Sequence, residues 1–241
     1  MRGILLIARR DFAAYVNTYW GWAILALSLL IDGVLFLVLG LGKAPKLSAE
    51  VLQQFFYLTG GVSLIASIPV TMRLFAEERQ TGTIVLLESS PLSDRQLVLG
   101  KYLSGMIFVL VFAACTAYMP ALIFVNGKIG LDEIAVGYLG IGLMGSAGVA
   151  IGTWASAISR NQIFAAVVGA AVVAAFVVCW MLSKQVDAPF KGLISYLAFF
   201  DRQFQPFQQG QLSSESVTYF ISVTFAFLLM ATQSLSARRW R

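Results

Sequence analysis

Residues 72–102 read MRLFAEERQTGTIVLLESSPLSDRQLVLGKY, a long polar interruption between two apolar runs. Its basic residues are Arg73, Arg79, Arg95 and Lys101, and its acidic residues are Glu77, Glu78, Glu88 and Asp94. Because these charges cancel, the stretch is a poor candidate for adsorption to anionic lipid headgroups. The pattern therefore indicates either a segment that docks onto another protein or an ordinary polar loop between two membrane spans.

The first part of this stretch predicts two short helices. Gly82 is the expected C-terminal cap of a helix over residues 77–81, since a residue without Cβ adopts the left-handed cap conformation at little cost. Thr83 can cap a second helix over residues 84–89. Pro91 ends that helix, because proline lacks an amide donor and restricts the residue before it.

A third helix is expected after the proline. Ser93 and Gln96 have the spacing of a capping box, in which each side chain bonds the backbone N–H of the other residue. The helix that starts there runs straight into the next apolar run. The three pieces together predict a compact, jointed element.

The composition identifies the class of protein. Hydrophobic residues make up 59% of 241 and charged residues 12%, and the mean hydropathy is +0.80. No soluble domain of this size tolerates such a surface. A membrane span needs about 20 mainly apolar residues, and six stretches qualify: residues 20–41, 55–72, 103–125, 134–157, 163–182 and 217–235. We expect an all-α integral membrane protein with six transmembrane helices in a single domain over residues 1–241.

The positions of Lys and Arg predict the orientation. With the N-terminus inside, the inner segments hold Arg2, Arg9, Arg10, Arg73, Arg79, Arg95, Lys101, Arg160, Arg238, Arg239 and Arg241. The outer loops hold Lys43, Lys46, Lys128, Lys184, Lys191 and Arg202. Most arginines are then inside, as the positive-inside rule requires, so both termini are expected in the cytoplasm. The net charge of +5 is therefore a topology signal, and a nucleic-acid partner is not expected.

Several kinds of chemistry are missing. The chain has no histidine, which excludes His-based nucleophilic catalysis and His-ligated metal sites. Cys115 and Cys179 lie inside apolar runs, as buried cysteines commonly do. None of the Gly-Lys pairs is followed by the Ser or Thr of a phosphate-binding loop. The chain is thus expected to be no enzyme and to bind no metal or cofactor, so any ATP must bind to another chain.

The N-terminal residues 1–19 mix apolar and basic character. The apolar run over residues 3–8 is too short for a signal peptide. An amphipathic helix on the inner leaflet fits better, followed by an aromatic belt of Tyr15, Tyr19, Trp20 and Trp22.

Asp32 lies in the first span, about 18 Å beyond Trp20 at 1.5 Å per residue, and so near the middle of the membrane. A carboxylate there costs about 2.5–3.5 kcal/mol on insertion scales, so it should face the bundle or a wet cavity. Asp32 is either a group of a substrate path or gate, or a protonated structural residue.

Pro69 lies near the inner end of the second span, with Ser67 and Thr71 close enough to satisfy backbone groups that the proline frees. A kink there would direct the chain into residues 73–102 and carry motion, although proline is also simply tolerated in spans. Pro120 in the third span invites the same argument with less reason.

Two further segments have a distinctive composition. Gly148 and Gly152 of the fourth span have the small-xxx-small spacing that permits close helix packing, within one subunit or at a dimer seam. The Ala/Val-rich fifth span is interpreted as a packing helix. The outer loop over residues 183–216 contains an aromatic stretch, residues 192–207, expected to fold back on the bilayer surface as short interfacial or re-entrant helices.

The interruption also carries a family resemblance. The motifs are residues 77–83 (EERQTGT), Leu86-Leu87, residues 90–93 (SPLS) and residues 98–102 (VLGKY). They resemble the segment between the second and third spans of permease subunits of type-2 ATP-binding-cassette exporters, in particular the gliding-motility-like branch. The family often has an acidic residue soon after Gly-Thr, where this chain has Val85, and Glu88 carries the charge one turn later. The closing residues 204–207, 219–220 and 237–241 resemble the last outer loop, sixth span and basic tail of the same family.

The resemblance implies a function for several segments. Residues 73–102 would be the coupling segment that sits in a groove of the partner ATPase, residues 1–19 an elbow helix, and the first, second and fifth spans the lining of a central interface. The residues expected to couple the chain to the ATPase are Phe75, Glu77, Glu78, Arg79, Thr81, Gly82, Thr83, Leu86, Leu87 and Pro91. Asp32 and Pro69 would belong to the intramembrane path or gate.

The resemblance also implies partners and a location. ATP and Mg²⁺ would bind to separate nucleotide-binding ATPase subunits, and a second permease subunit would complete a homodimer or a related heterodimer. An auxiliary membrane protein with an external domain often accompanies this branch. The expected place is the bacterial cytoplasmic (inner) membrane, and the expected function is export or force transmission. The alternative is a channel or membrane-assembly scaffold that works without an ATPase, while a membrane enzyme is the weakest option.

Overall fold

The computed structural model describes residues 2–41, 47–84, 92–127, 129–183, 196 and 198–239. These residues form helices joined by turns, and no strand occurs among them. The helices are α1 (Arg2–Val16), α2 (Tyr19–Leu35), the π-helix η1 (Phe36–Leu41), α3 (Ser48–Thr71), α4 (Ala76–Gln80), α6 (Asp94–Thr116), α7 (Tyr118–Asn126), α8 (Leu131–Ile158), α9 (Gln162–Ser183), the π-helix η2 (Phe199–Phe204), α11 (Gln205–Gln208) and α12 (Ser214–Arg239).

Among the described residues, six helical segments are long and apolar enough to cross a membrane: Tyr19–Leu41, Ser48–Gln80, Asp94–Val125, Leu131–Ile158, Gln162–Cys179 and Ser214–Ala237. Each contains or closely matches one of the six stretches that the sequence predicts. The prediction of an all-α, multi-pass membrane protein is therefore confirmed.

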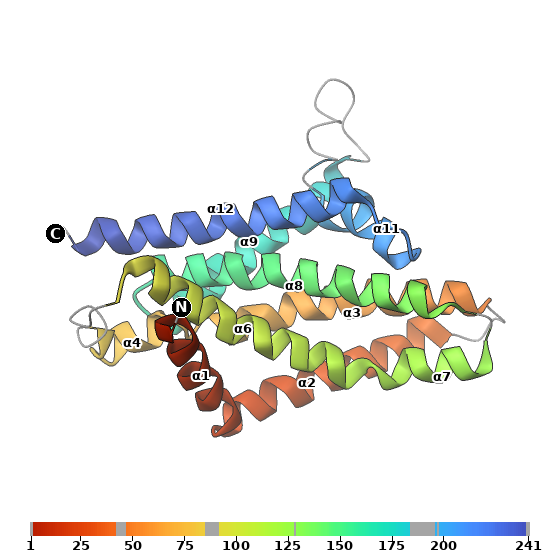
Figure 1. Ribbon diagram of the computed structural model, residues 1–241, viewed down its shortest axis with the longest axis horizontal. Coiled ribbons are helices and arrows are strands. Elements are labelled where there is room, and N and C mark those ends of the chain that lie inside the picture. Colours follow the sequence, from red (N-terminus) through yellow and green to blue (C-terminus); the bar gives the residue numbers. More distant parts are fainter. Residues whose placement is uncertain are drawn as a thin grey trace.

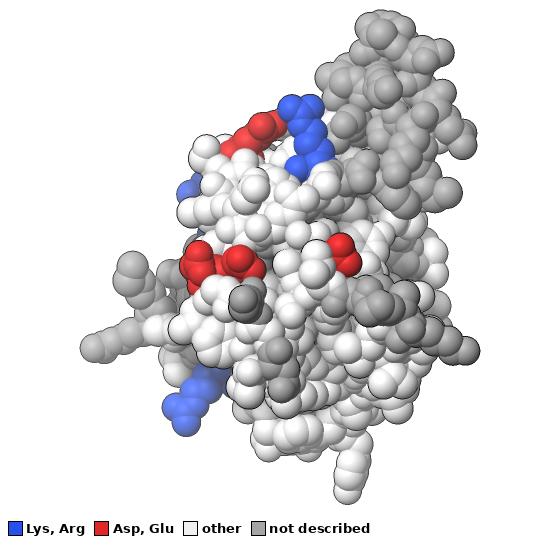
Figure 2. All heavy atoms as spheres, turned by 90° about the vertical axis from the view of Figure 1, so that its right-hand side faces the viewer, with Lys and Arg blue, Asp and Glu red and all other residues white. Residues whose placement is uncertain are grey.

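The bundle has two ends of different character (Figure 1). We call one the basic end, where α1, α4, the start of α6 and the end of α12 lie together. The other, the far end, holds η1, α7, α11 and the first turns of α3 and α8. Figure 2 looks onto the far end and shows a few acidic and basic side chains among uncharged ones. Arg202 pairs there with Glu215 at 3.2 Å.

The centre of the bundle is a close contact between α3 and α8. Hydroxyl residues occur once per turn on α3 and are all fully buried: Thr59, Ser63, Ser67 and Thr71. A Cβ atom on Gly148 would lie 2.7 Å from Ser67 Oγ, and one on Gly152 would overlap Thr71 Oγ1. Missing side chains on α8 thus make room for the hydroxyls of α3. The glycine spacing serves packing within one chain, as expected.

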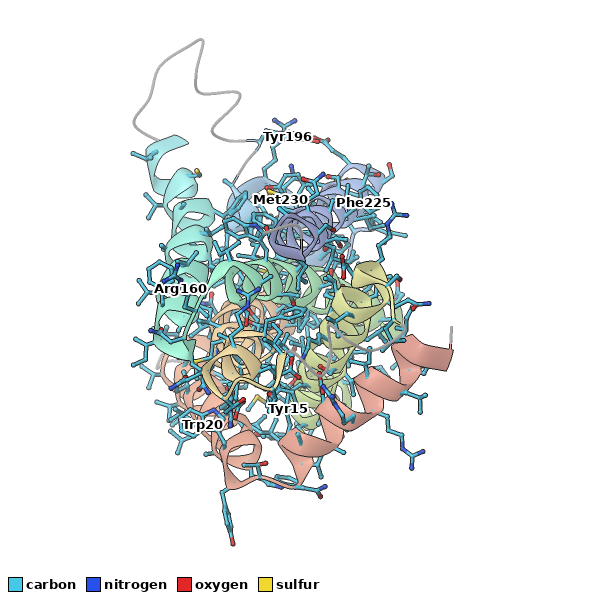
Figure 3. The ribbon with its side chains drawn as sticks, turned by 90° about the vertical axis from the view of Figure 1, so that its left-hand side faces the viewer. Tyr15, Trp20, Arg160, Tyr196, Phe225 and Met230 are labelled. Carbon is cyan, nitrogen blue, oxygen red and sulfur yellow. The ribbon has the colours of Figure 1, made fainter. Side chains whose placement is uncertain are left out.

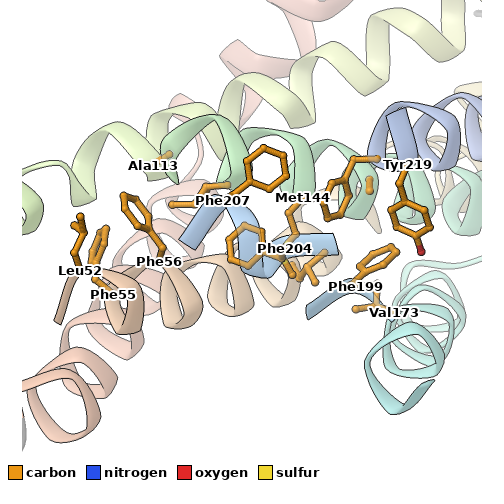
Figure 4. Packing of buried hydrophobic residues seen from close by; sticks show 14 of the residues in the cluster. Leu52, Phe55, Phe56, Ala113, Met144, Val173, Phe199, Phe204, Phe207 and Tyr219 are labelled. Atoms are coloured by element: carbon orange, nitrogen blue, oxygen red, sulfur yellow. The ribbon is translucent and has the colours of Figure 1, made fainter. Parts of the chain in front are cut away.

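Towards the far end, the core is aromatic (Figure 4). Phe199, Phe204 and Phe207 come from η2 and α11 and are completely buried among residues of α3, α8 and α12. The sequence predicts short helices here, folded back on the bilayer surface as interfacial or re-entrant helices; the structure has these short helices and directs the three rings into the core. The rings turn inward because Gly60 and Gly140 leave room for Phe204 and Phe207 on the facing helices.

Two prolines behave differently in their spans. Helix α3 continues through Pro69 to Thr71, and the hydroxyls of Ser67 and Thr71 donate to Leu64 O and Ser67 O, at 2.6 Å each. Pro69 has no N–H group and so leaves Ile65 O without its helical donor. The two hydrogen bonds from Ser67 and Thr71 go to other carbonyls and do not replace that donor. The third span is interrupted at Ala117, between α6 and α7, just before Pro120.

The fifth span differs from its prediction. Only 17% of the segment Gln162–Cys179 of α9 is buried. Its side chains Ile163, Phe164 and Val167 are largely exposed. The Ala/Val-rich composition suggests a packing helix, but apolar side chains are also what a helix facing lipid or another subunit requires. Helix α9 lies on the same side of the bundle as α2 (Figure 3).

Candidate coupling junction

The turn from α3 to α4 at the basic end is held by a serine of α8. Ser156 Oγ accepts hydrogen bonds from the backbone N–H groups of Phe75 (3.0 Å) and Ala76 (3.1 Å), and it donates to Met72 O at 3.1 Å. The first N–H groups of a helix have no partner within the helix, so a hydroxyl at this place satisfies them. One side chain of α8 thus closes the end of α3 and the beginning of α4.

From another side, α1 holds the end of α3. The hydroxyl of Tyr15 donates to Val70 O at 2.7 Å. Burial raises the pKa of the Tyr15 phenol well above its ordinary value, so the group stays neutral and keeps its donor proton. The sequence places Tyr15 in an aromatic belt with Tyr19, Trp20 and Trp22. The last three side chains are exposed, but Tyr15 is buried and does not belong to the belt.

Helix α1 reaches this position by packing against α6. A Cβ atom on Gly100 would lie 2.8 Å from Ile7 Cβ, so the glycine of α6 allows the two helices to come close. Ile7 and Tyr15 join the buried cluster at the basic end. Because Arg10 and Asp11 lie on the same helix between these two anchors, they are brought next to α4 and α6.

Four charged side chains from three helices meet there. Arg10 Nη2 lies 2.9 Å from Glu78 Oε1 and 2.8 Å from Asp11 Oδ1. Lys101 Nζ lies 2.9 Å from Glu78 Oε1 and 3.1 Å from Asp11 Oδ2. Two bases and two acids therefore form one neutral network that joins α1, α4 and α6. We call it the junction network.

Lys101 is the most buried member of the junction network, with 1% of its surface exposed. Its ammonium group lies 5.1 Å from the centre of the Phe75 ring, which adds a cation–π contact. A buried charge is tolerated only when it is paired and hydrogen-bonded. Glu78 and Asp11 supply that pairing, so Lys101 fixes where α1 and α4 lie relative to α6.

Two more contacts made by arginine side chains fix α4, one to a carboxylate and one to a backbone carbonyl. Arg73 forms a bidentate pair with Glu77, at 2.8 and 2.6 Å, and lies 5.9 Å from the Trp20 ring. Arg79 Nη1 donates to Ser159 O, beyond the end of α8, at 2.7 Å. Both glutamates of the predicted coupling motif are thus bound by bases of their own chain.

The exposed part of the motif is the turn after α4. Thr81, Gly82 and Thr83 are exposed, and Gly82 has a φ of +73°, the left-handed conformation predicted for the cap. The hydroxyls of Thr81 and Thr83 lie 2.9 Å apart. The predicted coupling residues Leu86, Leu87 and Pro91, with almost all of the expected helix over residues 84–89, lie outside the described residues.

The chain continues from Leu92 into α6. Ser93 Oγ accepts from Gln96 N, and Gln96 Oε1 accepts from Ser93 N, at 3.4 and 3.2 Å. This is the capping box that the sequence predicts.

A polar pocket of about 430 Å³ opens between α1 and α4. The junction network lies in its wall, together with Tyr15, Thr18, Arg73, Glu77, Thr81 and Thr83. The exposed turn and the charged interior of the junction are therefore parts of the same surface at the basic end.

The sequence missed the residues that connect this element to its neighbours. Tyr15, Lys101 and Ser156 are among the buried polar contacts of the junction, although the sequence assigned no contact to any of them and Lys101 appeared only as part of the motif over residues 98–102. One signal was available, because Lys101 lies two residues before the third predicted apolar run and beside a glycine. A lysine in that position requires an acidic partner from another helix.

The other predicted site residues lie apart from the junction network. Asp32 is fully buried in α2, facing the bundle as predicted, and Thr59 Oγ1 donates to its Oδ2 at 3.3 Å. Pro69 lies one turn before the junction, in the wall of an apolar groove of about 360 Å³ between α2 and α3.

The comparison with protein families gives a clear match. A family model described as "ABC-2 family transporter protein" matches residues 5–231. No curated protein matches the chain with significant similarity.

Proposed function

Because the match over residues 5–231 shows that the chain belongs to the ABC-2 transporter family, we propose that a separate ATPase drives this membrane-spanning subunit through the α3–α4 turn. The movement would serve export or force transmission across the membrane. ATP and Mg²⁺ bind to that partner, and the present chain performs no catalysis.

The observation that carries this proposal is the combination of an exposed tip with a fixed base. Residues 81–83 are exposed, while α4 is tied to α1 and α6 by the junction network, and its first N–H groups are bound by Ser156 of α8. A force applied at the tip would therefore act on four helices together. In an ordinary surface loop it would be lost in the motion of the loop.

We propose separate roles for two parts of the motif. Glu78 is engaged inside the junction network and Glu77 is paired with Arg73. We assign these glutamates to holding α4 in place. The contact surface is assigned to residues 80–83 and to the segment that follows them.

The orientation and the second subunit follow from the same proposal. The basic end faces the cytoplasm of a bacterial inner membrane, with both termini on that side, because a cytoplasmic ATPase must reach residues 80–83. A second permease subunit packs on the side formed by α2 and α9, where apolar residues are exposed: Leu27, Leu30, Val34, Ile163, Phe164 and Val167. An auxiliary protein with an external domain would meet the far end.

Site-specific cross-linking tests the proposal. Cys115 and Cys179 are replaced by alanine, and single cysteines are introduced at Gln80 or Thr83, with Gln211 as the control at the far end. Co-expressed candidate ATPases should form a cross-linked product with the cysteines at 80 and 83 and not with the cysteine at 211. An ATPase-independent channel or scaffold would give no such product with any ATPase encoded nearby, and that result would reject the coupling function.

A further inference from the structure

Asp32 is a buried acid that the junction does not use. None of its surface is exposed, and among the described residues its one hydrogen bond is the 3.3 Å contact from Thr59 Oγ1 to Oδ2. The other carboxyl oxygen, Oδ1, has no hydrogen-bond partner in the described part of the chain. No ion pair of the described residues includes Asp32. The ion pairs at the two ends of the bundle use other acids, namely Asp11, Glu78 and Glu215.

No Lys or Arg of the described residues forms an ion pair with Asp32. Helix α3 contributes Thr59, and α8 contributes Tyr138, a titratable group within electrostatic range. The Tyr138 hydroxyl is 3.3 Å from Thr116 Oγ1 of α6. On the α7 side, Met119 lies 3.8 Å from the place of a Cβ on Gly33. The described surroundings are therefore apolar or hydroxylic.

An ionised carboxylate is costly in such a place. Burial of an isolated charge without a paired counter-charge is far more costly than burial of a neutral polar group, and one long hydrogen bond from a hydroxyl does not compensate for it. A neutral carboxylic acid avoids most of that cost. Lys101 shows the contrast within the same chain, because its buried charge has two carboxylates within 3.1 Å.

We propose that Asp32 is a proton-binding site inside the membrane and that, in this arrangement of the helices, it holds a proton on Oδ1. The ligand is a proton delivered by hydronium: an O–H bond forms on the carboxylate oxygen, one O–H bond of the hydronium ion breaks, and a neutral water molecule is released. Release requires water to reach the carboxylate, and a separation of α2 from α3 would open a path for it. The bundle would then take up a proton when α2 and α3 close and lose it when they separate.

This inference does not depend on a partner ATPase, so it can fail or hold independently of the proposed function. The purified chain is placed in lipid nanodiscs in D₂O at neutral pH, and its infrared spectrum is compared with that of Asp32→Asn. The wild type should show the carbonyl stretching band of a protonated carboxylic acid, and the variant should lack it. An identical spectrum in that region would mean that Asp32 is ionised, with a metal or another cation as its counter-charge, and would overturn the proposal.

Two further variants keep the result decisive. Asp132→Asn removes an exposed acid at the far end and should leave the band unchanged. Thr59→Val removes the hydroxyl donor while keeping the shape of the side chain, and it should shift the band to higher frequency, since the carbonyl loses its hydrogen bond. If Asp32→Asn does not fold, this shift carries the test, and a band insensitive to Thr59→Val would contradict the assignment.

Discussion

Lys101 Nζ lies 2.9 Å from Glu78 Oε1, across the interface of α6 and α4, with almost none of the lysine exposed. The pair joins a membrane-spanning helix to the base of the exposed turn over residues 81–83. Asp11 and Arg10 of α1 complete the network. The position of the turn therefore depends on three helices, and single substitutions in them should have unequal, ordered effects.

Glu78→Gln should destabilise the protein far more than Glu77→Gln. Removal of one partner of a buried ion pair costs about 3–5 kcal/mol because the other charge stays buried. Arg73 lies in the turn before α4, and its pair with Glu77 is partly exposed; exposed pairs are worth about 0.2–1 kcal/mol. Thermal unfolding in detergent, followed by tryptophan fluorescence, measures the difference. Equal midpoints for the two variants would contradict the network.

A second substitution should partly reverse the effect of Glu78→Gln. After the first substitution Lys101 keeps Asp11 but loses Glu78, the nearer of its two carboxylates. Lys101→Met removes this less well paired buried charge and retains much of the apolar length of the lysine. We expect the double variant to be more stable than Glu78→Gln alone. Additive losses in this double-mutant cycle would show that the two side chains act independently.

Ser156→Ala should loosen the α3–α4 turn, whereas Ser159→Ala should not. The first variant removes the acceptor of two backbone N–H groups, and loss of such a cap typically costs about 1 kcal/mol. The second removes a hydroxyl that bonds only Ala155 of its own helix, and it keeps the carbonyl that Arg79 uses. Amide hydrogen exchange of residues 72–80 by mass spectrometry compares them. Faster exchange in both variants, or in neither, would argue against the cap.

Gly152→Ala should disturb the contact of α3 with α8, with Gly142→Ala as its control on the same helix. A Cβ at position 152 would overlap Thr71 Oγ1, whereas nothing lies within 4 Å of a Cβ at position 142. Overpacking of this kind costs about 1–3 kcal/mol. The variants are compared by their unfolding midpoints and by the amount of folded protein extracted from membranes. A stable Gly152→Ala would mean that the two helices do not pack this closely.

Tyr15→Phe should cost about 1 kcal/mol, as expected for one hydrogen bond, and Tyr19→Phe should cost nothing, because Tyr19 is exposed. Burial raises the pKa of Tyr15 in the folded state above the value of about 10 in an unfolded chain. The folded state then holds its proton more tightly, so this stabilisation is complete below pH 10 and is lost as the pH rises further. The difference between wild type and Tyr15→Phe should therefore be constant between pH 6 and 9, which denaturant titrations at both pH values would check.

The fold could largely be predicted because membrane spans depend on length and hydropathy, and both are local properties of the sequence. The cap at Gly82 and the capping box at Ser93 were equally accessible, since each depends on residues within one turn. The direction of the rings in η2 and α11 could not be predicted from the sequence. Aromatic residues suit both a bilayer surface and a core, and only the spaces beside Gly60 and Gly140 decide between them.

The candidate site was located by its motif, but its internal contacts were not predicted. Glu77 and Glu78 are adjacent in sequence, yet one is paired within its own turn and the other with α1 and α6. Ser156 could not be distinguished from other serines of the spans, because its role depends on which backbone groups lie opposite. Long-range partners of this kind leave no periodic trace in a single sequence.

The spacing of the junction network along the chain has a consequence for biogenesis. Asp11 and Arg10 are synthesised first, Glu78 follows 68 residues after Arg10, and Lys101 comes 90 residues after Asp11. The network therefore cannot close until the ribosome has delivered the beginning of the third span. Until then Asp11 and Glu78 lack the ammonium group that both of them bind, so the α3–α4 turn reaches its final place only once the third span has arrived.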